Sequence, residues 1–137
     1  MHFEYDIESG DFTNAGSTSS AVKKILKQLN VDPTIIKRTV VALYEAEVNI
    51  VAHSYGGKIY IDIEEDYILI RLVDNGPGIP DIDKAMEVGY STASQSVREM
   101  GFGAGMGLPN IKNNTDRLSI TSKVGEGTTV EIYNKLQ

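Results

Sequence analysis

The strongest constraint on the fold is a change of hydrophobic period in the middle of the chain. Residues 33–53 carry apolar side chains at helical spacing, whereas the next segment, KIYIDIEEDYILIRLVD (58–74), alternates apolar and polar residues. The alternation predicts two strands joined by a tight acidic turn at Glu64–Asp66. A long helix followed by such a hairpin favours a helical layer packed on an antiparallel sheet.

Helical spacing predicts two further helices on either side of this unit. The first follows a polar loop through Ser20, and its apolar residues recur at helical spacing: Ala21, Val22, Ile25, Leu26 and Leu29. The central helix is expected to begin with Asp32 as N-cap and Pro33 as its first residue. It should end near His53, and its predicted core residues are Ile36, Val40, Leu43, Val48 and Val51. The last helix is expected at Leu108–Asp116, opened by Pro109.

Strand signals complete the expected fold. Residues 2–7 alternate like an opening strand, and LSITSKVGEGTTVEIYN (118–134) suits a second hairpin with Gly125 and Gly127 in its turn. Residues 82–88 suit a short extra helix, whereas residues 89–106 are too polar and glycine-rich for a fixed element. The sum is one α+β domain spanning 1–137, a two-layer α/β sandwich with helices on one face of a mixed, mostly antiparallel sheet.

Composition excludes several classes of partner. The net charge of −6 provides no broad basic surface, so nucleic acid is not an expected partner. The chain has no cysteine, which excludes disulfides and thiolate metal sites. Its apolar runs, such as Tyr67–Ile70, are far shorter than the ~18 residues that a membrane span needs. No membrane association is expected, and the cytoplasm is the expected location.

A polar stripe runs along the predicted central helix. Glu45, Asn49 and His53 lie four residues apart, so their side chains share one side of the helix. A solvated helix face would explain this pattern. Alternatively, Asn49 offers a neutral oxygen to Mg²⁺, and Glu45 accepts a proton from an attacking hydroxyl or water. Glu47 points off this stripe and is expected on the surface.

The stretch DNGPG (74–78) follows an apolar strand directly. Its ordinary interpretation is a turn, because Asn-Gly and Pro-Gly pairs are typical turn residues. Asp74, however, closes a strand where a carboxylate would be partly buried, and an adenine amino group is one donor that could satisfy it. Gly76 and Gly78 would then let a flat base approach the backbone.

Glycine occupies every second position in the middle of REMGFGAGMGLPN (98–110). A strand with glycine along one face would be weak, and neither the P-loop pattern nor G-x-G-x-x-G fits. The remaining interpretations are a plain surface loop or a flexible lid over phosphates. In the second case the lid runs into a helix whose free N–H groups at Gly107–Asn110 hold a phosphate, and Arg98 reaches toward the terminal phosphate.

Four stretches in a fixed order carry a family resemblance. They are EAEVN (45–49), DNGPGIP (74–80), GFGAGMGLPNIK (101–112) and GEGTTV (125–130). They resemble the N, G1, G2 and G3 boxes of the GHKL (gyrase, Hsp90, histidine kinase, MutL) ATPase superfamily. The resemblance covers about residues 17–134 and implies the Bergerat ATP-binding fold.

The resemblance also implies roles for individual residues. Asn49 looks like the Mg²⁺ ligand, Glu45 like the general base and Asp74 like the residue that reads adenine. Further nucleotide contacts are implied in the base pocket and the lid: Gly76, Gly78, Ile79, Gly103, Gly105, Met106, Gly107 and Leu108. Thr128 or Thr129 matches the residue that supports adenine through Asp74 and water. ATP and Mg²⁺ are therefore the expected cofactors.

Within the superfamily, the chain looks most similar to small bacterial anti-sigma factors and stressosome switch-protein serine kinases. The likeness rests on GPGIPDIDKAMEVGYSTAS (76–94) and GAGMGLPNIKNNTDRLSITSKVGEGT (103–128). A histidine kinase would need an acceptor histidine on a dimerising hairpin, which neither His2 nor His53 suits. The segment around 93–101 is longer than its counterpart in the switch kinases.

Two function classes follow from this resemblance. One is a protein serine/threonine kinase that transfers the ATP γ-phosphate to a STAS-domain antagonist, with Glu45 as base. The other is a binding module that sequesters a sigma factor or another regulator according to its nucleotide state. The presence of Glu45 favours the kinase, because a pure binder would not need a base. A homodimer is one option for the oligomeric state.

Overall fold

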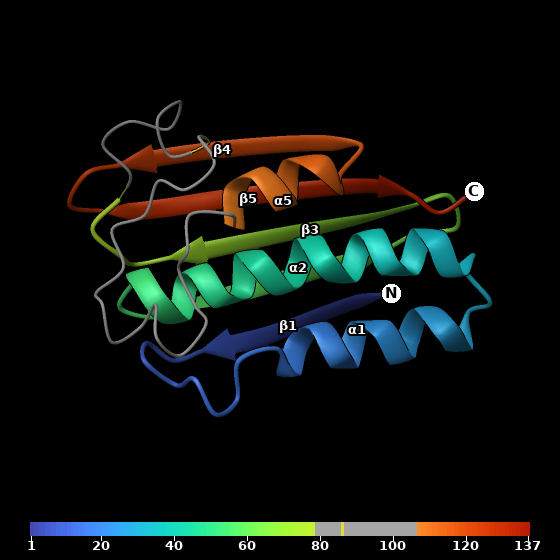
Figure 1. Ribbon diagram of the computed structural model, residues 1–137, viewed down its shortest axis with the longest axis horizontal. Helices are drawn as coiled ribbons and strands as arrows, with labels where there is room; N and C mark the ends of the chain where they lie inside the picture. The colour runs from blue at the N-terminus through green and yellow to red at the C-terminus, as the bar shows by residue number, and fades with distance from the viewer. Residues whose placement is uncertain (79–85, 87–106) are drawn as a thin grey trace.

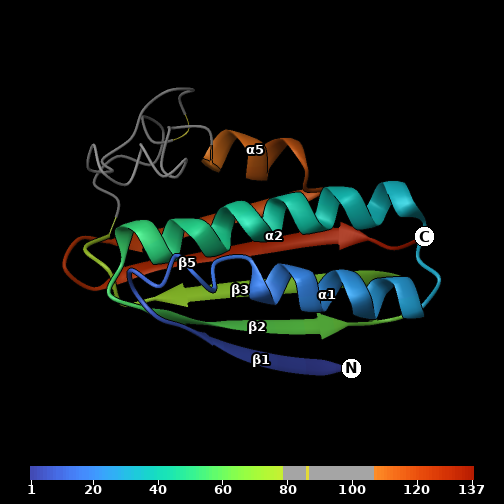
Figure 2. The ribbon, with the colours of Figure 1, turned by 60° about the horizontal axis from the view of Figure 1, so that its bottom comes forward.

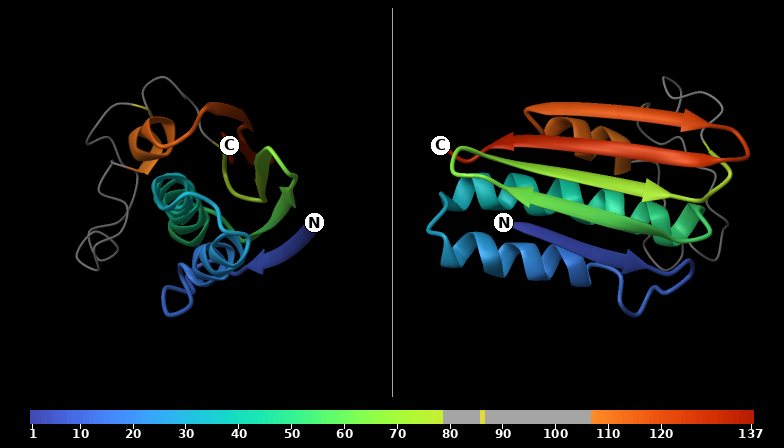
Figure 3. Two further views of the ribbon diagram at one scale, coloured as in Figure 1. Left: turned by 90° about the vertical axis from the view of Figure 1, so that its right-hand side faces the viewer. Right: turned by 180° about the vertical axis from the view of Figure 1, so that it is seen from behind.

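The computed structural model describes residues 1–78, 86 and 107–137. A sheet with strand order β1-β2-β3-β5-β4 forms one layer, and every strand pair in the described part is antiparallel. Helices α1, α2 and α5 form the other layer and cover one face of the sheet, as the end-on view in Figure 3 shows. The expected two-layer α+β sandwich is confirmed.

The five strands lie close to their predicted positions. They are β1 (His2–Ile7), β2 (Gly57–Ile63), β3 (Tyr67–Asp74), β4 (Arg117–Lys123) and β5 (Gly127–Lys135). Both predicted hairpins are present, as β2–β3 and β4–β5. Because β5 pairs with β3 as well as with β4, the second hairpin continues the sheet, and the β4–β5 turn lies beside the end of β3 (Figure 1).

Helix α2 (Pro33–His53) has the predicted bounds. The Asp32 side chain accepts a hydrogen bond of 2.8 Å from the Thr34 N–H and so caps the helix. Such a cap contributes about 1 kcal/mol. Of the predicted core residues, Val40 is only partly buried, whereas the other four are buried: Ile36, Leu43, Val48 and Val51.

Helix α1 (Ser17–Gln28) begins before the predicted start, inside the expected polar loop. Val22 and Leu26 are fully buried, whereas Leu29, which continues their spacing, follows the end of the helix and is 40% exposed. The early start has a physical reason outside the helix itself. The N-cap residue, Gly16, has no side chain, and the first N–H groups of α1 are satisfied by a side chain from α2, which is described below.

Helix α5 (Gly107–Asn113) starts one residue before the predicted helix and ends three residues before the predicted end. Its Ile111 is fully buried against α2 and the sheet. The predicted helix at 82–88 and the glycine-rich segment 89–106 lie outside the described residues, apart from residue 86.

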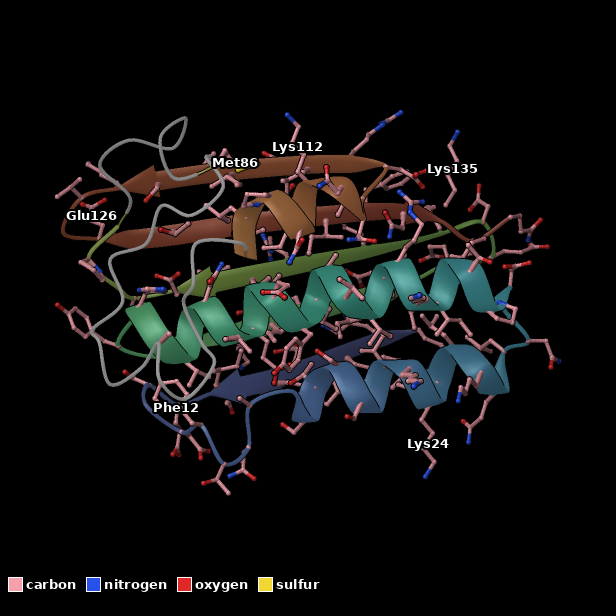
Figure 4. All side chains as sticks on the ribbon, viewed as in Figure 1. Phe12, Lys24, Met86, Lys112, Glu126 and Lys135 are labelled. Carbon is pink, nitrogen blue, oxygen red and sulfur yellow. The ribbon has the colours of Figure 1, made fainter. Side chains whose placement is uncertain are left out.

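The core lies between the two layers. It joins the inward isoleucines of β2 and β3 to Val22 and Leu26 of α1 and Leu43 of α2. Each of these large side chains contributes about 1.5–3 kcal/mol on burial. Figure 2 shows the helices lying along the strands, and in Figure 4 the labelled side chain of Lys24 extends outward from α1. In the described part of the chain, no helix is both long and apolar enough to cross a bilayer.

Candidate functional site

Asp74 ends β3 at the point where three backbone segments meet. Its Oδ1 accepts hydrogen bonds from the Gly76 N–H (2.8 Å) and the Thr128 N–H (3.1 Å). The Thr128 Oγ1 lies 2.8 Å from the Ser122 Oγ of β4. The second carboxylate oxygen, Oδ2, accepts no hydrogen bond from any described residue, so Asp74 keeps one charged acceptor for a donor from outside the fold.

Close backbone contacts surround this carboxylate. A Cβ at Gly76 would lie 2.7 Å from the Cβ of Ser54, and a Cβ at Gly78 would lie 2.6 Å from the carbonyl oxygen of Lys123. At Gly127 a Cβ would lie only 2.1 Å from the carbonyl oxygen of Asp74. We call these segments, together with Asp74 and Thr128, the Asp74 corner. Ser54 and Gly127 are parts of it that sequence reasoning did not assign to the site.

The structure distinguishes the two threonines that the sequence left as alternatives. The Thr128 backbone N–H donates to Asp74, and the Thr128 side chain is buried. Alternate residues of a strand point to opposite faces of a sheet, so the side chain of Thr129 points to the other face. Thr128 is therefore the threonine that supports the Asp74 carboxylate in this fold.

Glu45 and Asn49 lie on one side of α2, as predicted, and both are half-buried. The Asn110 Nδ2 of α5 donates toward the Glu45 Oε1 at 3.5 Å. His53, at the end of the same stripe, is also half-buried, and this burial lowers its pKa below the ordinary value. This face of α2 thus carries a carboxylate and an amide that are accessible from one side.

Glu47 is not on the surface, so that expectation is wrong. Its side chain is only 2% exposed. The Oε2 accepts from the N–H groups of Gly16 (3.0 Å) and Thr18 (3.3 Å), and the Oε1 accepts from the N–H (3.2 Å) and the Oγ (2.9 Å) of Ser19. Glu47 therefore caps α1 from α2, where the helix dipole favours a negative charge. The sequence holds one signal for this cap. The first turn of α1 contains no acidic residue, so its N–H groups need an acceptor from elsewhere in the chain.

A groove of about 560 Å³ lies between α1 and α2 and reaches Glu45. Its lining combines apolar side chains with the Lys23 cation and several hydroxyls, and it includes Val41, Tyr44, Ser19 and Ser20. Tyr44 is 39% exposed. The Glu47 cap fixes the α1 wall of this groove, because Ser19 is one of the residues that it binds.

Several predicted site residues belong to the segment that the structure leaves undescribed: Ile79, Arg98, Gly103, Gly105 and Met106. Gly107 begins α5, and Leu108 packs partly buried against the core. Within residues 1–78, 86 and 107–137, no group of three or more histidine or acidic side chains could hold a metal ion.

Comparison with known proteins identifies the class. Residues 34–137 match the model of the family described as histidine kinase-, DNA gyrase B-, and HSP90-like ATPase. This match extends over most of the chain and includes α2, the Asp74 corner and α5. The chain therefore belongs to this ATPase family.

Particular relatives lie within the predicted subgroup. The chain is 35% identical over 121 residues to the serine/threonine-protein kinase RsbT of Bacillus subtilis, covering 84% of each protein. It is 31% identical over 144 residues to an anti-sigma F factor of Anoxybacillus flavithermus, covering 99% of this chain and 92% of that protein. The predicted likeness to anti-sigma factors and switch-protein kinases is thus confirmed.

Solved structures share the fold at low sequence identity. The SiaB–SiaC complex of Pseudomonas aeruginosa aligns with a TM-score of 0.66 at 11% identity, covering 96% of this chain and 88% of that one. The RsbU and RsbW domains of a Mycobacterium tuberculosis protein align with a TM-score of 0.64 at 17% identity, covering 98% of this chain and 32% of that one. These likenesses support the architecture.

Proposed function

We propose that this chain is an ATP-dependent protein serine/threonine kinase of the anti-sigma and switch-kinase type. Its substrate would be a hydroxyl side chain on a STAS-domain partner. The observation that carries the proposal is the position of Glu45, which is half-buried on α2, one turn from Asn49 and at the edge of the groove. The same proposal places the chain in the cytoplasm, where such a partner would act.

The residues present fit a bound nucleotide. The Asp74 Oδ2 would accept a hydrogen bond from the amino group of adenine, while Oδ1 remains occupied by two backbone N–H groups. Gly76 and Gly78 keep side chains away from this surface. Asn49 would supply one neutral oxygen to Mg²⁺. ATP supplies the transferable phosphoryl group, and Mg²⁺ neutralises charge on its phosphates.

Glu45 would then act on the partner. Its carboxylate accepts the proton of the partner's hydroxyl while that oxygen forms a bond to the γ-phosphorus. The bond from the γ-phosphorus to the bridging oxygen breaks, and ADP leaves with that oxygen. The groove between α1 and α2 would admit the acceptor segment, because it is open at Glu45 and combines apolar and polar side chains.

A nucleotide-dependent binding module is the second candidate. The similarity to proteins named anti-sigma F factor favours it, since such a name describes binding to a sigma factor. In that case the same nucleotide site would control which surface is presented to the partner, and turnover would be slow or absent. The two candidate functions predict different effects of a substitution at Glu45 on phosphate transfer.

Replacement of Glu45 separates chemistry from binding. Single-turnover transfer from radiolabelled ATP to the partner protein should fall by about 10²-fold in Glu45→Ala, near the lower end for loss of a general base. Nucleotide affinity should stay within a few-fold, because Asn49 and Asp74 remain. The free energy of unfolding should change by less than about 0.5 kcal/mol, as for an ordinary surface substitution.

Two results would contradict the kinase. Equal transfer rates for the wild type and Glu45→Ala would reject Glu45 as the base. Tight ATP binding without transfer to any candidate partner would favour the binding module. Glu45→Gln is the matched variant, since it keeps the size of the side chain and one acceptor oxygen but removes the charge and the ability to take a proton.

Removal of Mg²⁺ tests the role of Asn49. ATP should bind with appreciable affinity only when Mg²⁺ is present, because a single amide oxygen is a weak ligand until phosphates complete the coordination shell. Isothermal calorimetry in Mg²⁺ and in excess chelator measures the difference directly. Equal affinity under the two conditions would remove Asn49 from metal binding.

A further inference from the structure

Helix α5 brings a second polar side chain to the proposed base. The Asn110 Nδ2 lies 3.5 Å from the Glu45 Oε1, across the contact between α5 and α2. Figure 2 shows α5 lying along α2 on the side away from α1. Asn110 is half-buried and reaches Glu45 from α5, and no described α5 residue lines the groove that also reaches Glu45.

A chain of hydrogen bonds fixes the position of Asn110. The Asn114 Nδ2 donates to the Asn110 carbonyl at 2.8 Å, and the Asn134 Nδ2 of β5 donates to the Asn114 carbonyl at 3.1 Å. Asn134 is fully buried, and its amide also donates to the Thr39 Oγ1 of α2 at 3.0 Å. The same α2 that carries Glu45 therefore holds the helix that carries Asn110.

An amide at this place has a definite effect on a carboxylate. Its N–H binds one oxygen, selects one orientation of the side chain and leaves the Oε2 to accept a proton. Hydrogen bonds of catalytic groups are often long before the substrate binds and shorten in the reacting complex. Among the described residues that line the groove, the ionisable side chains other than Glu45 are Lys23 of α1 and Tyr44 of α2.

We infer that Asn110 is a positioning residue that orients Glu45 for proton transfer from the partner's hydroxyl. The inference rests on the proposed kinase function and gives a role to the side chain of Asn110, of which the sequence analysis considered only the backbone N–H. Asn110 acts through Glu45 and not through the nucleotide, and this makes the inference testable apart from the kinase proposal.

A double-mutant cycle tests it. In the full chain, Asn110→Ala should slow single-turnover transfer at saturating ATP by about tenfold, the typical effect of losing a hydrogen bond to a charged group. In the Glu45→Ala background the same substitution should have no further effect, because no carboxylate is left to orient. The affinity for ATP should stay within about threefold in all four proteins.

Asn110→Asp sharpens the test. It keeps the shape of the side chain but replaces the donor by a second carboxylate facing Glu45, so transfer should fall further than in Asn110→Ala. A role in packing alone predicts the opposite order, since the isosteric change disturbs packing least. Asn113→Ala is the matched control: it is the same substitution on the same helix, at an exposed residue, and it leaves the Asn110 amide and the hydrogen bonds that hold Asn110 in place. It should keep transfer within about threefold of the wild type.

The possible results distinguish a failure of the Asn110 inference from a failure of the kinase proposal. If the wild type transfers phosphate and Asn110→Ala slows transfer equally in the presence and absence of Glu45, the inference is wrong and the kinase stands. The same conclusion follows if Asn110→Ala has no effect. If the wild type transfers no phosphate, both are wrong. Thermal unfolding of each variant shows whether a slow variant is folded, and an unfolded Asn110→Ala leaves the isosteric Asn110→Asp to decide.

Discussion

Glu47 and Asp74 each accept several backbone hydrogen bonds, and the two carboxylates differ in how completely their oxygens are used. Glu47 is 2% exposed and binds three N–H groups and one hydroxyl, using both of its oxygens. At the Asp74 corner, one oxygen binds two N–H groups and the other receives none from the described residues. The comparison teaches that a fully satisfied carboxylate holds the fold together, whereas a half-satisfied one is available to a ligand.

The same chemical change at these two positions should therefore have opposite results. Both positions can be changed from acid to amide without altering the shape of the side chain. The first two predictions use this matched pair, and the third concerns the end of α2, which lies next to the Asp74 corner.

The largest effect is expected for Glu47→Gln. In the glutamine, an NH₂ group replaces one of the two carboxylate oxygens. This donor then faces a buried backbone N–H group that needs an acceptor. The loss of charged hydrogen bonds and the unsatisfied donors should lower the free energy of unfolding by about 3 kcal/mol. Urea denaturation measures it. The affinity of the folded protein for ATP should change by less than about threefold. An unchanged stability would contradict the assignment of Glu47 as the cap of α1.

Asp74→Asn should show the reverse pattern. The amide oxygen can still accept from Gly76 and Thr128, so the free energy of unfolding should change by less than about 1 kcal/mol. The other side becomes a donor facing the adenine amino group, so ATP binding should weaken by about 2–3 kcal/mol. Calorimetric titration with ATP and Mg²⁺ measures this. An unchanged Kd would show that Asp74 does not contact the nucleotide. A large loss of stability would show that Asp74, like Glu47, serves mainly to stabilise the fold.

The smallest effect concerns pH. Burial lowers the pKa of His53 in the folded protein below the ordinary value of 6.5, so the unfolded chain binds more protons between these two pKa values. The contribution of His53 to stability is therefore complete above pH 6.5 and is lost as the pH falls toward the folded pKa. His53→Gln should remove this part of the pH dependence, amounting to less than about 1 kcal/mol because water screens a half-buried ring. Identical pH profiles of stability for the two proteins would contradict it.

The sequence predicted the elements of the fold well, because most of them are defined by local patterns. The bounds of α2 follow from Asp32, Pro33 and apolar residues at helical spacing. The two hairpins follow from alternation and turn residues. The start of α1 was placed too late, since no local cap marks it: Gly16 offers no side chain, and the acceptor, Glu47, comes from 31 residues further along the chain.

The candidate site was predicted in part. The order of the motifs identified Glu45, Asn49 and Asp74 as candidate site residues. The structure places the first two on one side of α2 and the third at the end of β3. Their roles stay predictions. The choice between Thr128 and Thr129 needed the register of β5 on β3, because a shift of one residue exchanges the faces of a strand. The sequence named Asn110 only for its backbone N–H, and the contact of its side chain with Glu45 became visible only in the structure.

The sequence by itself determined the family, the two layers and the central helix, since periodicity, turn residues and motif order are all local properties of the chain. Only the tertiary structure decided what each carboxylate does. Glu45 and Glu47 are two residues apart on the same helix and are chemically identical, yet one lines a groove and the other is buried in a cap. The reason is that an acidic side chain takes its role from the donors that surround it, and these donors come from segments distant in the sequence.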